Sequence, residues 1–242
     1  MATPPDGDPT GQLARQRWSA AHGGVDPDAS RWIGGWLALV HRLARPLAAR
    51  RVPPGAITVG GLIVSALVPA VAAAPGGWPI AAAALAVVAG LLDGMDGAVA
   101  RMTGTDSAWG AVLDDLTDRL SDLLLLSALW VLGAPTWACV GAGALTLLLE
   151  SLRASARAVG MTGVGALTVW ERPSRIIVVA TVGGLCGLAR VAEDVVDVPS
   201  DAVEVLAGTG TVVAAILATW SIAHLAFVAH RSLGVSKAPR DR

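Results

Sequence analysis

The sequence predicts an all-α integral membrane protein with six transmembrane helices and an N-terminal amphipathic helix in the membrane interface. Of its 242 residues, 54% are apolar and 15% are charged, whereas a soluble domain carries about 25% charged residues. Apolar segments close to the ~20 residues that cross a bilayer follow one another between turns marked by Pro and Gly. One helical bundle accounts for this length, and no second large domain is expected.

The first elements precede the bundle. Residues 1–29 are rich in Pro, Gly and Asp and contain no apolar signal segment, which predicts a disordered cytoplasmic tail. In residues 30–51, apolar side chains share one helical stripe: Trp32, Trp36, Val40, Leu43 and Leu47. Arg42 and Arg45 lie off this stripe, which favours a helix lying in the membrane interface over one packed on a soluble domain.

The membrane domain is expected to comprise residues 30–232, with a second cytoplasmic tail at 233–242. Its six spans are predicted at about 56–74, 79–100, 108–133, 136–158, 174–190 and 203–229. All of the 18 Lys and Arg residues except Arg190 fall on one side of this arrangement. Because basic residues accumulate on the cytoplasmic side, both termini are predicted to be cytoplasmic, in a multi-pass protein of the plasma membrane.

Four aspartates lie in the second and third spans: Asp93, Asp96, Asp114 and Asp118. A carboxylate at bilayer depth costs about 2.5–3.5 kcal/mol, so each of them needs a functional reason. Asp93 and Asp96 share one helical face, as do Asp114 and Asp118, and a helical hairpin brings the two faces together. Because oxygen ligands suit hard cations, the pattern predicts a site for Mg²⁺ or Mn²⁺ at the cytoplasmic face.

Small residues and an arginine accompany the acids. Gly97, Ala100 and Arg101 share the face of the first pair, and Gly110 lies one turn before the second. The arginine suits phosphate oxygens, so a phosphate-bearing substrate bridged by one or two metals is expected. A small ion- or proton-coupled transporter that uses the same acids is the alternative. Three further acids are predicted to be structural or turn residues: Asp106, Asp115 and Asp122.

The string Asp93-x2-Asp96-Gly97-x2-Ala100-Arg101-x8-Gly110-x3-Asp114-x3-Asp118 resembles the signature of the CDP-alcohol phosphotransferase family at every defined position. The resemblance implies transfer of a phosphatidyl group from CDP-diacylglycerol to an alcohol, with release of CMP. It further implies a homodimer and no nucleic-acid partner. A non-catalytic homologue is disfavoured because all four acids are present.

The resemblance also implies roles for individual residues. The four aspartates would bind two divalent ions, and Asp118 would be the general base that accepts the proton of the acceptor hydroxyl. The CDP moiety would be held by Thr58, Gly97, Ala100, Arg101, Ser107 and Gly110. In the stretch Pro54-Gly-Ala-Ile-Thr58, Gly55 stands where the family often has Asn, so this chain lacks the contact that the Asn side chain would make.

A group of arginines is expected to bind the acceptor: Arg153, Arg157, Arg172 and Arg175. Positive charge at the cytoplasmic ends of spans explains the same residues without a ligand. Asp118-Arg119 and the string Glu171-Arg-Pro-Ser-Arg175 look similar to actinobacterial phosphatidylinositol phosphate synthases. The fourth span departs from them, with Arg153 for Lys, Ser155 for Arg and Arg157 for Glu. The similarity makes inositol 1-phosphate the leading acceptor, and because of these departures glycerol 3-phosphate or another polyol phosphate is the next.

Overall fold

The computed structural model describes residues 31–161 and 167–234. Over these ranges the chain forms helices and no strands: α2 (Arg31–Ala49), α3 (Pro54–Ala72), α4 (Trp78–Thr103), α5 (Ala108–Val131), α6 (Thr136–Ala158), α7 (Arg172–Ala192) and α8 (Ala202–Gly234). The predicted tail of residues 1–29 lies outside the described residues. The helix α8 runs through Gly234, so the second predicted tail is helical where it begins and lies outside the described residues from 235 onward.

The helices of the bundle correspond to the predicted spans within a few residues. Five of them are long and apolar enough to cross a membrane: α3, α4, α6, α7 and α8. The helix α5 has 24 residues, which is a sufficient length, but it carries the second pair of aspartates and further charges. The all-α membrane fold is therefore confirmed, and the count of six spans stays a prediction.

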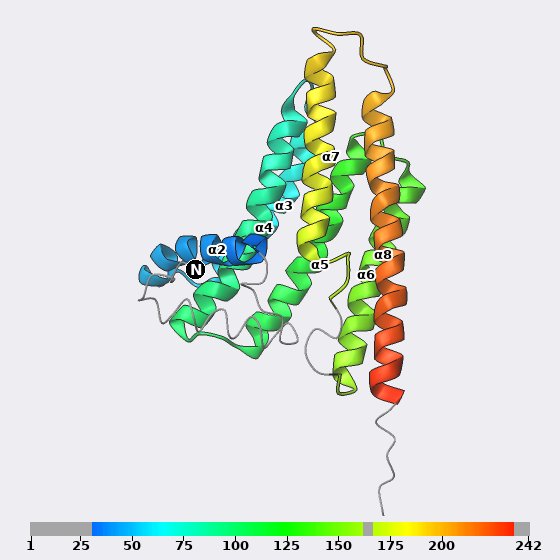
Figure 1. Ribbon diagram of the computed structural model, residues 1–242. Coiled ribbons are helices and arrows are strands. Elements are labelled where there is room, and N and C mark those ends of the chain that lie inside the picture. Colours follow the sequence, from blue (N-terminus) through cyan, green and yellow to red (C-terminus); the bar gives the residue numbers. More distant parts are fainter. Residues whose placement is uncertain (1–30, 162–166, 235–242) are drawn as a thin grey trace, which may run out of the picture.

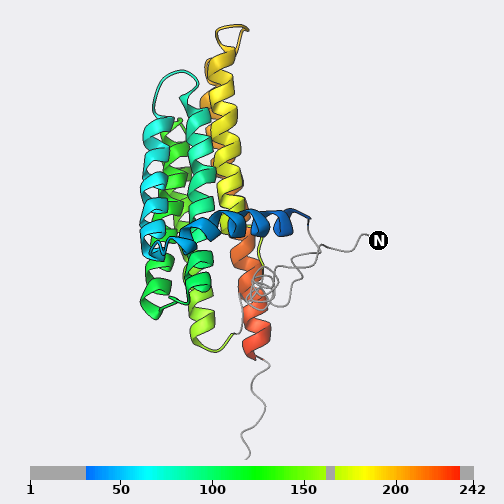
Figure 2. The same ribbon diagram turned by 90° about the vertical axis from the view of Figure 1, so that its left-hand side faces the viewer.

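The axes of the bundle helices are roughly aligned, with successive helices running in opposite directions, and α2 lies across them (Figure 1, Figure 2). On α2, Val40 and Ala44 are buried against Met95 and Val99 of α4. A Cβ atom on Gly94 would lie 3.2 Å from Val40, so this glycine permits the close approach of the two helices. One face of α2 thus packs against the half of α4 that carries the aspartates, whereas Trp36 and Leu43 of the predicted stripe are exposed.

Helix boundaries follow from the sequence. Proline occupies the first turn of α3, α4 and α7, where its missing N–H group costs nothing. The helix α4 ends at Gly104, whose φ of 65° suits glycine. Ser107 caps α5 by accepting a hydrogen bond from the backbone N–H of Gly110 at 3.0 Å. The short connection between these two boundaries forms the hairpin that places the aspartates of α4 opposite those of α5.

A buried tryptophan anchors the segment before α7. Trp170 is fully buried, its indole N–H donates to Thr146 of α6 at 2.9 Å, and its backbone N–H donates to Ser221 of α8 at 3.0 Å. These bonds satisfy the polar groups of a large buried side chain. They hold the start of α7, which carries Glu171 and Arg172, against two other helices.

Candidate active site

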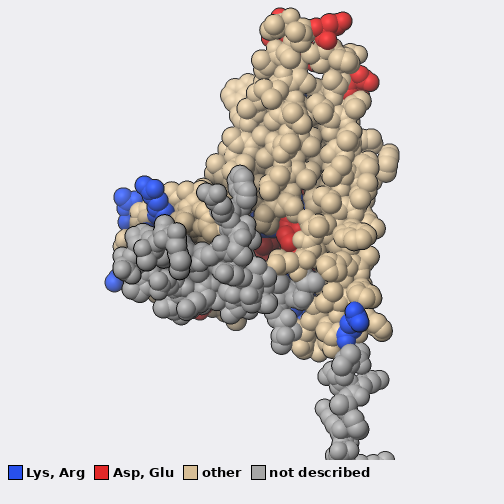
Figure 3. All heavy atoms as spheres, in the orientation of Figure 1, with Lys and Arg blue, Asp and Glu red and all other residues tan. Residues whose placement is uncertain are grey.

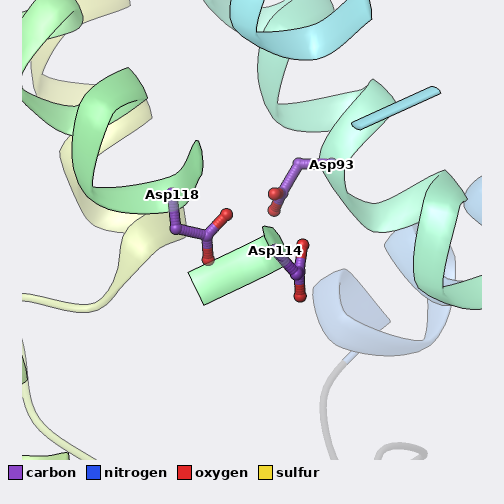
Figure 4. Close-up of side chains that lie close together, drawn as sticks. All are labelled: Asp93, Asp114 and Asp118. Atoms are coloured by element: carbon purple, nitrogen blue, oxygen red, sulfur yellow. The ribbon is translucent and has the colours of Figure 1, made fainter. Parts of the chain in front are cut away.

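Three of the four predicted aspartates meet at one point. Asp93 of α4 and Asp114 and Asp118 of α5 each offer a carboxylate oxygen within 4.8 Å of the others. Figure 4 shows the three side chains pointing toward one another. Figure 3 shows atoms of acidic residues inside a hollow of the surface. The hairpin of α4 and α5 therefore assembles the cluster that helical spacing predicts.

This cluster fits a divalent cation. Its ligand atoms are all carboxylate oxygens, and each of the three residues is only partly exposed. The Oδ1 atom of Asp118 is buried, and its cationic partner among the described residues is Arg172. A group of carboxylates this close together is stabilised by positive charge, which a divalent cation supplies. Asp93, Asp114 and Asp118 would hold Mg²⁺ or Mn²⁺, both of which prefer oxygen ligands.

Asp96 lies beside this group and has different partners. Its carboxylate is 4% exposed and accepts hydrogen bonds from the Thr58 hydroxyl at 2.6 Å and from the backbone N–H of Gly97 at 2.5 Å. Thr58 also donates to the carbonyl oxygen of Pro54 at 3.1 Å, which fixes its rotamer. Thr58 therefore orients one of the predicted metal ligands, a role distinct from the nucleotide contact predicted for it.

The residues predicted to hold the CDP moiety lie around the end of the α4–α5 hairpin. Arg101 is exposed, and its guanidinium lies over Gly97, where an added Cβ would be 3.1 Å from an Nη atom. A Cβ atom added to Gly110 would lie 3.0 Å from the hydroxyl oxygen of Ser107, so glycine at this position leaves room for that hydroxyl. Ser107 and Gly110 thus have a capping role in α5. A contact of the nucleotide with Gly97, Ala100, Arg101, Ser107 or Gly110 stays a prediction.

The four predicted acceptor arginines differ in their surroundings. Arg172 reaches the aspartate cluster, with Nη2 3.1 Å from Asp93 and Nη1 paired with Asp118. Arg175 is buried and donates to Asp122 and Glu150 at 2.5 Å each. Its guanidinium also donates to the carbonyl oxygen of residue 170 at 3.0 Å. These contacts account for Arg175 as the centre of a network that ties α5, α6 and α7 together.

Arg153 and Arg157 lie one turn apart on α6. Arg153 is buried and donates to Glu171 at 2.7 Å, with Glu150 at 3.8 Å. Arg157 is exposed, and no ion pair joins it to another described residue. The interpretation that these arginines serve a ligand stays a prediction for both.

A small cavity of about 180 Å³ extends from Asp118 of the aspartate cluster to the charged network around Arg175. Ten charged residues line it: Asp115, Asp118, Arg119, Asp122, Glu150, Arg153, Arg157, Glu171, Arg172 and Arg175. Asp118 thus belongs to the aspartate cluster and to the wall of the cavity. A group bound in the cavity lies beside the carboxylate that is predicted to act as the base.

Two structural features were not predicted from the sequence. Glu171 accepts hydrogen bonds from Arg153 and from the hydroxyl and backbone N–H of Thr168 at 2.7–2.9 Å. Burial tends to raise the pKa of the Glu171 carboxyl, but Arg153 and Thr168 outweigh it, so the pKa lies below its ordinary value. Asp122 pairs with Arg175, which agrees with its predicted structural role. The contacts of Glu171 with Arg153, and of Trp170 with Thr146 and Ser221, join residues distant in sequence, and no local pattern indicates them.

Comparison with known proteins supports the interpretation of this site. The chain is 34% identical over 152 residues to the archaetidylinositol phosphate synthase of Methanothermobacter thermautotrophicus, covering 62% of this chain and 75% of that protein. It is 34% identical over 161 residues to the phosphatidylinositol phosphate synthase of Corynebacterium glutamicum, covering 62% and 71%.

The fold is also that of a solved structure. Phosphatidylinositol phosphate synthase PgsA1 of Mycobacterium tuberculosis, solved with CDP-DAG bound, superposes with a TM-score of 0.60 at 24% identity. The superposition covers 85% of this chain and 98% of that one. The CDP-alcohol phosphatidyltransferase family model matches residues 51–238, which include the whole α4–α5 hairpin and the charged cavity. The chain therefore belongs to the CDP-alcohol phosphatidyltransferase family and is a membrane transferase.

Proposed function

We propose that this enzyme transfers the phosphatidyl group of CDP-diacylglycerol to a hydroxyl of a phosphorylated alcohol, with inositol 1-phosphate as the first candidate and glycerol 3-phosphate as the second. The position of Asp118 is the observation that carries this proposal. Its carboxylate is part of the aspartate cluster and also lines the charged cavity. One side chain therefore faces both the groups that would hold the donor diphosphate and the space that would hold the acceptor.

The proposed reaction is a displacement at phosphorus. The acceptor oxygen forms a bond to the phosphorus that bears diacylglycerol, and the bond from that phosphorus to the CMP oxygen breaks. The proton of the acceptor hydroxyl passes to Asp118. Divalent cations held by Asp93, Asp96, Asp114 and Asp118 would supply positive charge for the diphosphate and the leaving oxygen. Asp96 would be oriented for this role by Thr58.

The donor is expected to enter beside the α4–α5 hairpin. Arg101 is exposed next to Gly97, and a guanidinium can bind two phosphate oxygens at once. Several relatives are named phosphatidylinositol or archaetidylinositol phosphate synthases, and a solved neighbour contains CDP-DAG. These names support CDP-diacylglycerol as the donor and an inositol phosphate as the acceptor.

The acceptor is expected to carry negative charge. The cavity beside Asp118 is lined by five arginines, and Arg157 stands among them without an ion pair to any described residue. A phosphate on the acceptor would pair with such groups, whereas a neutral polyol would not. The same wall also contains five acids, and a carboxylate oxygen that faces the cavity can accept a hydrogen bond from a hydroxyl group of the acceptor.

Release of CMP tests this function directly. Purified enzyme in lipid nanodiscs receives CDP-diacylglycerol, Mn²⁺ or Mg²⁺, and one acceptor from a panel: inositol 1-phosphate, glycerol 3-phosphate, inositol or glycerol. We expect CMP release with a phosphorylated acceptor and a requirement for the metal. Asp118→Asn should abolish turnover, whereas the same change at Asp194, in the connection between α7 and α8, should leave it intact. The absence of CMP release with every acceptor and both metals would refute the proposal.

The active site is proposed to face the cytoplasm, in the plasma membrane. Arg190 lies at the opposite end of α7, beside a connection that contains Glu193, Asp194 and Asp197. The distribution of basic residues supports this orientation. In a variant without Cys139 and Cys186, a cysteine placed at position 194 should react with a membrane-impermeant maleimide added to intact cells. A cysteine placed at position 105 should react only after lysis, and the reverse pattern would contradict the orientation.

The enzyme is also proposed to be a homodimer that contacts membrane lipid over the rest of its surface. Large apolar side chains are exposed along several helices, including Trp130, Trp137 and Trp220. Native mass spectrometry of protein released from nanodiscs should give twice the mass of the 24.5 kDa chain. A single species of monomer mass at all protein concentrations would exclude the dimer.

A further inference from the structure

Arg172 lies at the boundary between the aspartate cluster and the charged cavity. Its guanidinium contacts Asp93 on α4 and Asp118 on α5, which supply two of the three clustered oxygens. Arg172 also lines the cavity that is proposed to hold the acceptor. A single cationic side chain therefore occupies the position where metal ligands and acceptor meet.

The Arg172 guanidinium is held by carboxylates from two helices. Nη2 lies 3.1 Å from Asp93, and Nη1 pairs with Asp118. The buried Nε atom makes no hydrogen bond with the described residues. Both of these acids are predicted metal ligands, so a divalent cation bound by Asp93 and Asp118 would compete with Arg172 for their oxygens. A buried guanidinium that loses these partners needs another anion.

The backbone of Arg172 is fixed, so any change of partner involves the side chain alone. Arg172 is the first residue of α7 and is followed by Pro173. The residues before it are anchored, because Trp170 is bonded to α6 and α8, and Glu171 is bonded to Arg153. An arginine on a rigid backbone can still reorient about its own torsion angles on a short timescale.

We propose that Arg172 is a positioning residue that couples metal binding to acceptor binding. It shares the oxygens of Asp93 and Asp118 with the divalent cations, and when cations take those oxygens its guanidinium turns to the anionic group of the acceptor. This inference rests on the proposed function for the nature of the acceptor. It goes beyond that function by coupling the two sites, so that binding of metal and binding of the acceptor favour each other.

The coupling is reciprocal. If metal releases Arg172 toward the cavity, an anion in the cavity draws Arg172 away from Asp93 and Asp118 and so favours metal binding. Typical coupling free energies change an affinity by about fivefold or more. Removal of the guanidinium should therefore strengthen the binding of metal alone, since a competing cation is lost, and should abolish the effect of the anion on metal.

Binding of Mn²⁺ tests this without turnover. The electron paramagnetic resonance signal of free Mn²⁺ is titrated with enzyme in nanodiscs that lack CDP-diacylglycerol, in the presence or absence of inositol 1-phosphate, and in parallel with glycerol 3-phosphate. For the wild type, at least one of these anions should lower the Kd for Mn²⁺ by about fivefold or more. For Arg172→Gln, the Kd without anion should fall by about fivefold or more, and the anions should change it by less than about twofold.

Matched variants distinguish competition from a change of structure. Arg119→Gln removes a cation that lines the cavity but pairs with Asp115 and not with the cluster, so the Kd for Mn²⁺ without anion should not change. Arg172→Lys keeps a positive charge that competes with metal, so its Kd for Mn²⁺ without anion should be closer to that of the wild type than the Kd of Arg172→Gln is. If Arg172→Gln does not fold, Arg172→Met provides the same measurement.

The proposal is overturned if the Gln variant binds Mn²⁺ no more tightly than the wild type, if the Lys variant tightens as much as the Gln variant, or if neither anion affects Mn²⁺ binding by the wild type. Any of these results together with normal CMP release would reject the coupling and leave the proposed function standing. If the enzyme releases no CMP but the Mn²⁺ titrations give the results expected above, the proposed function is rejected and the coupling stands.

Discussion

The ion pair between Asp122 and Arg175 gives the sharpest test of how the bundle is held together. The two side chains are 2% and 4% exposed and lie 2.5 Å apart, with Asp122 on α5 and Arg175 on α7. Removing one partner of such a buried pair typically costs about 3–5 kcal/mol, because the other charge stays buried without compensation. Replacing both partners by apolar residues of similar size is often close to neutral.

The structure indicates where each single variant falls in that range. Asp122→Leu leaves Arg175 with Glu150 at 2.5 Å and the carbonyl oxygen of residue 170 at 3.0 Å, so its cost should be near the lower end, about 3 kcal/mol. Arg175→Met leaves two acids, Asp122 and Glu150, without their shared cation, so its cost should be nearer about 5 kcal/mol. For a chain of this size, 3 kcal/mol corresponds to a fall in Tm of about 6–12 °C.

The wild type, the two single variants and the double variant form a double-mutant cycle. Thermal unfolding of these four proteins in nanodiscs, followed by tryptophan fluorescence, measures the costs. The double variant Asp122→Leu with Arg175→Met should be more stable than the sum of the single costs predicts, by at least about 2 kcal/mol. Single costs below about 1 kcal/mol, or strictly additive costs, would refute the assignment of Arg175 as a structural cation in this network.

Three further predictions concern packing, pH and the aspartates. Gly187→Ala should lower the Tm, because the added Cβ would lie 2.7 Å from a backbone nitrogen of α4. Gly60→Ala is the control, since a Cβ at that position meets nothing within 4 Å and should leave the Tm unchanged. Thermal unfolding of the two variants measures the difference. The pKa of the Glu171 carboxyl is depressed in the fold, so its contribution to stability should be complete above the unfolded value of 4.5 and lost as the pH falls through the lower folded value. Glu171→Gln should therefore be less stable at neutral pH and less sensitive to acid in unfolding at a series of pH values. Thr58→Val should weaken the binding of Mn²⁺ in resonance titrations by removing the donor to Asp96, and Thr58→Ser should restore it; equal affinities for both would exclude the orienting role.

The fold class and the nature of the enzyme were predictable from local sequence. The apolar spans, the prolines that begin helices and the spacing of the aspartates are properties of neighbouring residues. The structure confirms an all-α membrane fold, and family membership confirms a transferase over the transporter alternative. Together with the cluster of carboxylate oxygens, family membership also confirms the prediction of a divalent-metal enzyme.

The partners of the charged residues were not predictable in the same way. Arg153, Arg172 and Arg175 look alike in the sequence, as basic residues at the ends of spans. In the structure their nearest acids differ: Arg153 pairs with Glu171, Arg172 with Asp93 and Asp118, and Arg175 with Asp122 and Glu150. Which arginine meets which acid depends on how α5, α6 and α7 pack, and helical spacing within one segment contains no information on that packing.

The amino-acid sequence alone determined that four aspartates lie on two helical faces joined by a short turn, because a helix places residues three or four apart on one side. The tertiary structure alone decided that Asp93, Asp114 and Asp118 form the cluster, whereas Asp96 is bonded to Thr58. It also decided that Arg172 lies between the cluster and the cavity. The physical reason is that a buried carboxylate takes whichever donor or cation the neighbouring helices bring within reach, and only the packing of those helices sets the distance.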